Sequence, residues 1–278
     1  MVLESFLTPV EAKRNSWSLF FMGLIYSSIA ILLSLIVFPS QASIFSIFLT
    51  AIATTPLFVN LLKDEENLNL RLIDKKEQVF HEQLDLISVF FFLFLGYTVS
   101  FSLWFSFLPD WALQSVFSEQ VGNILSMQSL VTGNVVFNGL FELIFMNNLR
   151  VLFFCLLFSF IYGAGAVLIL AWNASVLGAA VGLFIREQLV KVVAGDYFSG
   201  IIVYFSSLPY GLGQYMFHGI FELMAYFLAS LAGGIISAAV VRRHYKSRNF
   251  FKLFQNTSYL IIGGIIFLLI AAFIEVNI

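Results

Sequence analysis

The chain has 278 residues, of which 60% are hydrophobic and 11% are charged. Soluble domains are about a quarter charged, so this chain carries less than half of the usual share. A soluble domain of this size could not hide so much apolar surface, because about a quarter of the unfolded chain's surface stays exposed after folding. The composition, with a net charge of −2, excludes a soluble enzyme, a disordered chain and a nucleic-acid-binding protein. It indicates an integral membrane protein, embedded in the lipid bilayer.

Long apolar runs predict the membrane-spanning helices, since a bilayer core of about 30 Å requires about 20 residues of helix. Two runs, 176–185 and 197–209, are too short to cross as straight helices. We therefore expect an all-α polytopic transmembrane helix bundle with six long spans plus a short, broken crossing and re-entrant pair. The six long spans and the short crossing helix would together cross the membrane seven times. The six long runs are residues 18–38, 43–62, 86–108, 149–172, 216–241 and 258–274.

The basic residues predict the orientation, because Lys and Arg are retained on the cytoplasmic side. They precede the first long run, follow the second and follow the fifth, and these three segments hold eleven of the fourteen. We expect a multi-pass protein of the cell membrane with a cytoplasmic N-terminus. The fourth and fifth long runs would then both end inside, so another crossing is required between them, in the segment 173–215.

Two parts of the chain are distinguished by composition. Residues 1–85 hold two spans and a polar connection, 63–85, whose apolar residues recur at helical spacing. This spacing predicts a cytoplasmic amphipathic helix that leads into the third span, either as a solvated helix or as a docking site for a partner. Residues 86–278 form the larger membrane part.

Ionisable groups within membrane helices are rare and costly, so each is a candidate functional residue. Glu142, His218 and Glu222 are such candidates. His218 and Glu222 are four residues apart and share a helix face. They are interpreted as a hydrogen-bonded structural pair, as part of a proton or ion pathway, or as two ligands of a metal. Because no HExxH motif or third ligand accompanies them, we expect no metal and no other cofactor.

Three further polar residues lie at the ends of the fourth long run. Asn148 and Arg150 are at its start, and Asn173 follows it and is expected to break the helix. Arg150 either reaches lipid headgroups or pairs with Glu142 or Glu222. No Ser/His/Asp arrangement, dinucleotide fingerprint or phosphate-binding loop occurs, so no catalytic residue is assigned and an enzyme is not expected.

Four glycines are candidates for close helix packing. Gly163 and Gly165 lie two residues apart, and Gly178 and Gly182 lie four residues apart. Small residues at such spacing allow helix backbones to approach closely in membranes. The pattern fits packing within one chain and also fits the seam of a homo-oligomer.

Polar and small residues follow one another in a characteristic order in the second half of the chain. In this order they resemble the stage II sporulation protein M family, well over 147–241 and more loosely from 86 onward, with the first two spans outside the resemblance. The residues that carry it are Asn147, Asn148, Arg150, Gly163, Gly165, Asn173, the small-residue run 176–184, Pro209, His218, Glu222 and the small-residue run 229–234.

The resemblance implies a membrane component without catalytic activity of its own. In endospore-forming bacteria the family is known as a membrane partner that anchors and localises peptidoglycan-degrading enzymes during engulfment; members also occur in non-sporulating bacteria and archaea. We therefore expect a non-enzymatic scaffold that recruits or organises other membrane or envelope proteins. The alternatives are a transporter with a site built on broken helices and, third, an intramembrane hydrolase.

Overall fold

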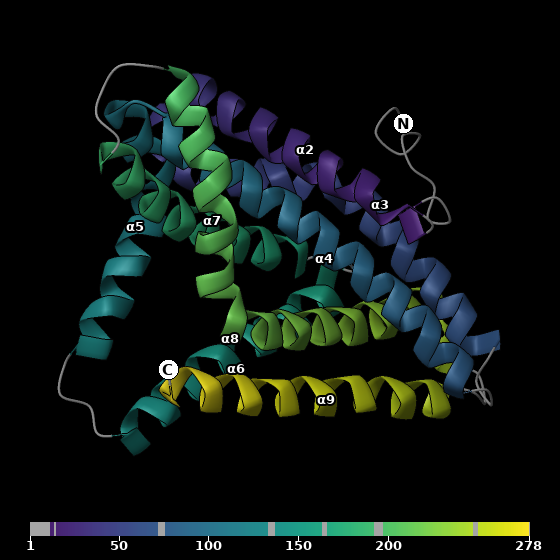
Figure 1. The fold of residues 1–278 in the computed structure, drawn as a ribbon. Helices are drawn as coiled ribbons and strands as arrows, with labels where there is room; N and C mark the ends of the chain where they lie inside the picture. The colour runs from purple at the N-terminus through teal and green to yellow at the C-terminus, as the bar shows by residue number, and fades with distance from the viewer. Residues whose placement is uncertain are drawn as a thin grey trace.

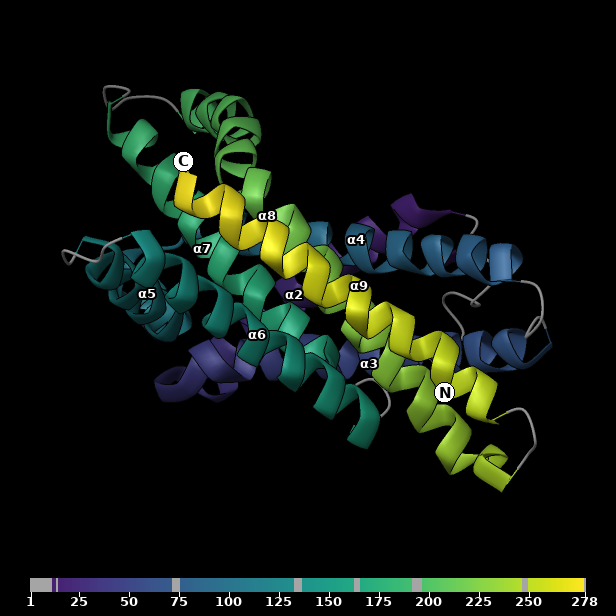
Figure 2. The same cartoon turned by 90° about the horizontal axis from the view of Figure 1, so that it is seen from below.

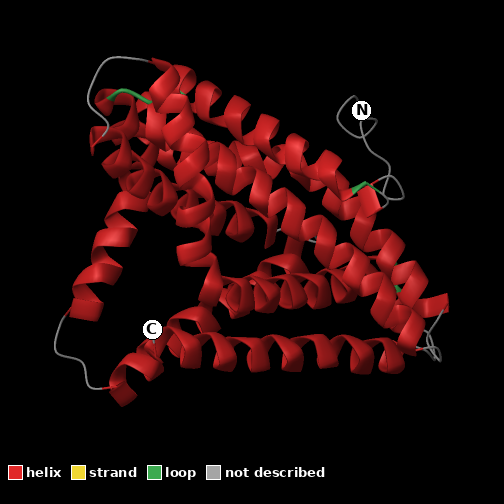
Figure 3. Ribbon diagram, in the orientation of Figure 1, coloured by secondary structure: helices red, strands yellow, loops and turns green. Residues whose placement is uncertain are grey.

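The computed structural model describes residues 12–13, 15–71, 76–132, 137–162, 166–191, 197–246 and 250–277. In this part of the chain every regular element is a helix (Figure 3). The α-helices are α2 (Ser16–Val37), α3 (Ala42–Arg71), α4 (Lys76–Phe107), α5 (Asp110–Thr132), α6 (Phe137–Tyr162), α7 (Ala166–Lys191), α8 (Tyr197–Val241) and α9 (Phe250–Asn277), and two 3-10 helices are η2 (Pro39–Gln41) and η3 (His244–Lys246).

Seven helices among the described residues are long and apolar enough to cross a membrane. This finding confirms the all-α, multi-pass class, and their number agrees with the expected seven crossings. The candidate spans are Ser16–Val37, Pro39–Arg71, Gln83–Phe107, Gly139–Ile161, Val167–Lys191, Gly219–Val241 and Phe250–Asn277.

The structure differs from the sequence-based expectation in where the chain is interrupted. α6 ends at Tyr162, and α7 begins at Ala166 and continues without a break through Asn173 to Lys191. One helix therefore contains both the end of the expected fourth span and the short run 176–185. Asn173 is accommodated because its Nδ2 donates a hydrogen bond to the Ile169 carbonyl one turn earlier, at 2.8 Å. The additional crossing is made by α7, so no separate short crossing helix is needed.

The other short run, 197–209, forms the first part of the 45-residue helix α8, which bends sharply (Figure 1). Pro209 lies inside this helix, where it cannot donate a backbone hydrogen bond and its ring displaces the preceding turn. The first part of α8 packs on α4 through Tyr204, whose hydroxyl lies 2.9 Å from Ser102 Oγ. The re-entrant segment expected from the sequence is thus a helical arm that leads into the last part of α8.

The most buried spans are α4 and the second part of α8 (Gly219–Val241), which form the centre of the bundle. α2, α6 and α9 lie at the periphery. Phe227 of α8 lies between two rings of α4, with its centroid 5.5 Å from that of Phe90 and 6.3 Å from that of Phe94. α9 runs antiparallel to the second part of α8, and the two helices are in extensive contact (Figures 1 and 2). This arrangement places α8 between α6 and α9, where the polar residues discussed below meet.

At the basic end of the bundle, α3 extends beyond its apolar run and buries two carboxylates. Glu65 and Glu66 both have side chains with no exposed surface. Lys13 Nζ lies 3.2 Å from Glu65, Arg242 Nη1 lies 3.0 Å from Glu66, and His244 Nδ1 also bonds to Glu66. The polar connection 63–85 is therefore the end of α3 and the start of α4, and its acidic residues hold together the N-terminal segment, α3 and the α8–α9 connection.

Candidate functional site

A hydrogen-bonded network of three side chains connects α6 to α8. Asn148 of α6 donates through Nδ2 to Oε1 of Glu222, and its Oδ1 accepts a hydrogen bond of 3.0 Å from the Tyr226 hydroxyl. Both functional groups of the Asn148 amide are therefore used, and the amide orientation is defined by its two partners. The network fixes the position of the Glu222 carboxylate.

The helical spacing of these residues explains why they meet. Glu222 and Tyr226 are four residues apart on α8 and so lie on one face. Asn148 lies nine residues into the span Gly139–Ile161, near its middle. In a bilayer no water competes for these groups, so the three polar side chains satisfy one another.

Five helices, α5 to α9, line an open cavity of about 660 Å³ beside this network. Asn148, Asn173 and Glu222 all line it, so the fold brings together three of the six polar residues that the sequence singled out. Its other polar lining residues are Asn123, Ser126, Asn147, Tyr226 and Glu275. The volume lies in the range of small-molecule binding sites.

A second, smaller cavity of about 200 Å³ adjoins the first. The two cavities share Asn173, Val176, Glu222 and Tyr226. Glu222 therefore stands at the boundary between a large space that faces α6 and α9 and a small one that faces α4 and α7.

Three of the predicted residues do not join this site in the described part of the chain. Glu142 and Arg150 are exposed on α6, line neither cavity and form no ion pair with each other or with Glu222. Arg150 lies eleven residues into the span Gly139–Ile161, at its middle, so its position does not place it at headgroup depth. His218 lies on α8 one turn before Glu222, and its side chain falls outside the described residues.

The two described packing glycines lie against α4. A Cβ atom at Gly178 would lie 2.6 Å from Phe101 Cβ, and one at Gly182 would lie 2.6 Å from Phe105 Cβ. Only glycine allows α7 and α4 to approach so closely. This face of α7 is occupied within the chain. Gly163 and Gly165 lie outside the described residues.

Two residues of the site escaped the sequence analysis. Tyr226 carried a signal, because it lies four residues after Glu222 on the same helix face. Glu275 lies near the end of the last span, where a carboxylate is common and is not a sign of a functional site. Only the antiparallel pairing of α8 with α9 brings it to the cavity.

The site offers hydrogen-bond acceptors above all. Two carboxylates and the amide groups of four asparagines (Asn123, Asn147, Asn148 and Asn173) face this space, together with apolar side chains. Such a set suits a cationic or hydrogen-bond-donating group that enters from the membrane side. Among the described residues, no three His, Cys, Asp or Glu side chains are grouped as metal ligands would be.

Replacing Asn148 with Leu is expected to destabilise the protein more than replacing Tyr226 with Phe. The first change leaves the half-buried Glu222 and the buried Tyr226 without their partner and costs about 2 kcal/mol, whereas the second removes one hydrogen bond and costs about 0.6 kcal/mol. At about 2–4 °C per kcal/mol, the melting temperatures in detergent should fall by about 4–8 °C and 1–2 °C. Equal shifts for the two variants would contradict the bridging role of Asn148.

The fold and this site define the chain as a multi-pass helical membrane protein with a polar, carboxylate-containing cavity between its helices. The chain matches the family described as stage II sporulation protein M over residues 47–278, and it belongs to that family. The match begins inside α3, upstream of residue 86, so the expectation that the second span lies outside the family resemblance was wrong. No curated protein and no solved structure matches the chain.

Proposed function

We propose that this protein is a non-enzymatic scaffold of the cell membrane that recruits other membrane or envelope proteins. The observation that carries the proposal is the open cavity in which Glu222 and Glu275 face the space between α6 and α9. Membership of the stage II sporulation protein M family supports it, because a membrane partner role is what that family implies.

The chemistry of the cavity defines the partner. A membrane helix that carries a Lys, Arg or hydrogen-bond-donating side chain is costly in lipid on its own. Docking such a helix at the cavity would place that side chain beside two carboxylates. The partner is therefore a membrane helix with a cationic or donor residue in the depth range of Glu222.

The distribution of charge supports an orientation with the N-terminus in the cytoplasm. Lys13, Arg242 and His244 meet Glu65 and Glu66 at one end of the bundle. Glu222 lies nineteen residues, or about 29 Å along the helix, before Val241 at that end, and so on the far side of the bilayer midplane. In this orientation the cavity belongs to the outer half of the membrane, toward the envelope.

Site-specific photo-crosslinking in native membranes tests the proposal. A photoreactive phenylalanine analogue at Phe154, an exposed residue that lines the cavity, is expected to capture a membrane protein. The same analogue at Ile266, an exposed residue of α9 outside the cavity, is the control. The capture should be lost in a Glu222→Gln background. Crosslinks to lipid alone, or a yield that does not depend on Glu222, would refute recruitment through this cavity.

Transport is the second candidate, favoured by the position of Glu222 at the boundary of two adjoining cavities. A carboxylate between two spaces is a common arrangement in proton-coupled carriers. Purified protein in vesicles that contain a pH-sensitive dye separates the candidates. A proton flux above that of empty vesicles, abolished in Glu222→Gln, would establish transport. No flux together with a Glu222-dependent crosslink would establish the scaffold.

A further inference from the structure

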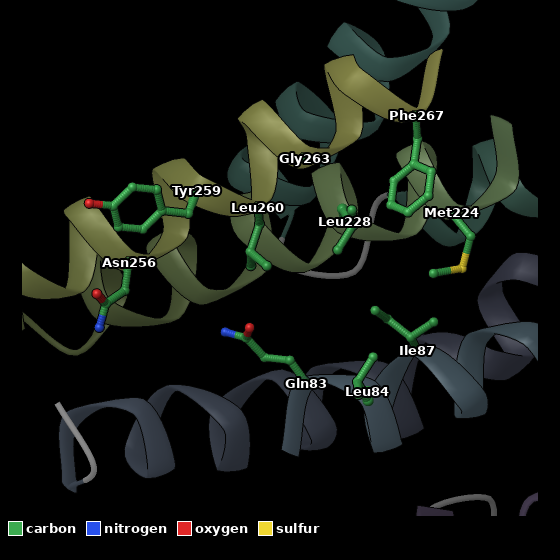
Figure 4. Close-up of a pocket in the computed structure, with 10 residues that line it drawn as sticks. All are labelled: Gln83, Leu84, Ile87, Met224, Leu228, Asn256, Tyr259, Leu260, Gly263 and Phe267. Carbon is green, nitrogen blue, oxygen red and sulfur yellow. The ribbon is translucent and has the colours of Figure 1, made fainter. Parts of the chain in front are cut away.

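An apolar groove lies between α4 and α9, on the opposite side of α8 from the polar network (Figure 4). It has a volume of about 420 Å³, and its floor is formed by Met224 and Leu228 of α8. Ile87 lines it from α4, and Leu260 and Phe267 line it from α9. α4 and α9 make little direct contact, because the groove lies between them.

The polar lining of the groove is confined to one end. Gln83, Asn256 and Tyr259 lie together there, whereas Met224 and Phe267 lie at the other end (Figure 4). The polar end belongs to the basic end of the bundle, because Asn256 lies six residues after Phe250, where α9 begins. Tyrosine is a typical residue of the membrane–water interface.

The length of the groove matches one leaflet of a bilayer. Asn256 and Phe267 are eleven residues apart on α9, which corresponds to about 16 Å along the helix. Half of a 30 Å hydrocarbon core is about 15 Å. The groove thus begins with polar groups at the interface and runs as an apolar channel to about the bilayer midplane.

Polarity and charge define the occupant. A groove that is polar at one end and apolar over about one leaflet matches the order of headgroup and acyl chain in a lipid. Lys252 lies one turn before Asn256 on the same face of α9, and Arg243 and Lys246 are exposed on the α8–α9 connection. Cationic groups at this level attract anionic headgroups.

We propose that the groove binds a single anionic phospholipid from the leaflet at the basic end of the bundle. One acyl chain lies along Leu228, Leu260 and Gly263, and the phosphate lies beside Asn256 and Lys252. The bound lipid fills the space between α4 and α9. This site is separate from the Glu222 cavity and does not depend on the scaffold proposal.

Native mass spectrometry of the full chain, titrated with phosphatidylglycerol or phosphatidylcholine, tests the proposal. We expect one tightly bound phosphatidylglycerol and at least tenfold weaker binding of phosphatidylcholine. Gly263→Phe should fill the groove, since a Cβ there lies 3.6 Å from Leu228 Cδ1 and the larger ring extends beyond it. That variant should bind phosphatidylglycerol at least tenfold more weakly. Ile266→Phe, on the exposed surface of α9, should bind as the unmodified chain does.

Two variants at the polar end of the groove test the proposal even if the Gly263→Phe variant does not fold. Lys252→Gln should weaken phosphatidylglycerol binding about fivefold and leave phosphatidylcholine unchanged, and Asn256→Leu should weaken both. Undiminished binding in a folded Gly263→Phe variant would overturn the proposal. Equal affinities for the two lipids would overturn it as well. A partner helix crosslinked into the groove would show that the occupant is a protein.

Discussion

Replacing Arg242 with Gln is expected to lower the melting temperature in detergent by about 6–12 °C. Arg242 Nη1 lies 3.0 Å from Oε2 of Glu66, whose side chain is completely buried. Removing one partner of a buried ion pair costs about 3 kcal/mol, because the buried Glu66 carboxylate then keeps only His244 as a partner. For a protein of this size, each kcal/mol corresponds to about 2–4 °C.

A double-mutant cycle shows whether the loss is due to this pair. Glu66→Gln combined with Arg242→Gln should be less destabilising than the sum of the single changes, because the double variant contains no uncompensated carboxylate at this position. Lys246→Gln, an exposed change in the same connection, is the control and should shift the melting temperature by less than about 2 °C. Additive losses in the cycle would mean that Glu66 and Arg242 stabilise the protein independently.

Replacing Gly178 with Ala is expected to destabilise the protein by about 3 kcal/mol. The added methyl group would lie 2.6 Å from Phe101 Cβ and 2.9 Å from the Thr98 carbonyl, so α4 and α7 must move apart. Such overpacking costs about 1–3 kcal/mol in well-packed cores. The backbone atoms of α4 cannot rotate away as a side chain can, so we expect the upper end of this range and a melting temperature lower by about 6–12 °C.

The same substitution at Gly122 should have the opposite effect. Gly122 is exposed within α5, and a Cβ there meets no atom within 4 Å. Alanine is favoured over glycine in helices by up to about 1 kcal/mol, so Gly122→Ala should raise the melting temperature by up to about 4 °C. A gain in stability for Gly178→Ala as well would show that propensity, and not the approach of α4 and α7, determines the effect at both positions.

Both predictions rest on contacts that were only partly foreseeable. Gly178 and Gly182 are recognisable from their spacing, since small residues four apart form a flat stripe on a helix. The stripe does not reveal which helix packs on it. α4 is seventy or more residues earlier in the chain. Only the folded bundle shows that Phe101 and Phe105 of α4 pack on the two glycines.

The segment 173–215, where the sequence predicted a broken crossing, shows how local patterns can mislead. Asn173 and the nearby glycines indicate a broken segment, because polar and small residues are poor in isolated membrane helices. In the structure, neighbouring helices cover this region and the Asn173 amide bonds to its own helix. Helix α6 instead ends at Tyr162, ten residues before the end of the apolar run 149–172.

The sequence alone determined the class, the number of crossings, the family and the polar residues to consider. These properties depend on composition, on the length of apolar runs and on the order of residues, all of which can be read without knowing which helices meet. The tertiary structure alone decided that Asn148 meets Glu222 across 74 positions, that Glu275 joins their cavity, and that Glu66 is paired with Arg242 across 176. The reason is physical: a polar side chain in a bilayer must find a partner, and which partner it finds depends on how the helices cross and pair.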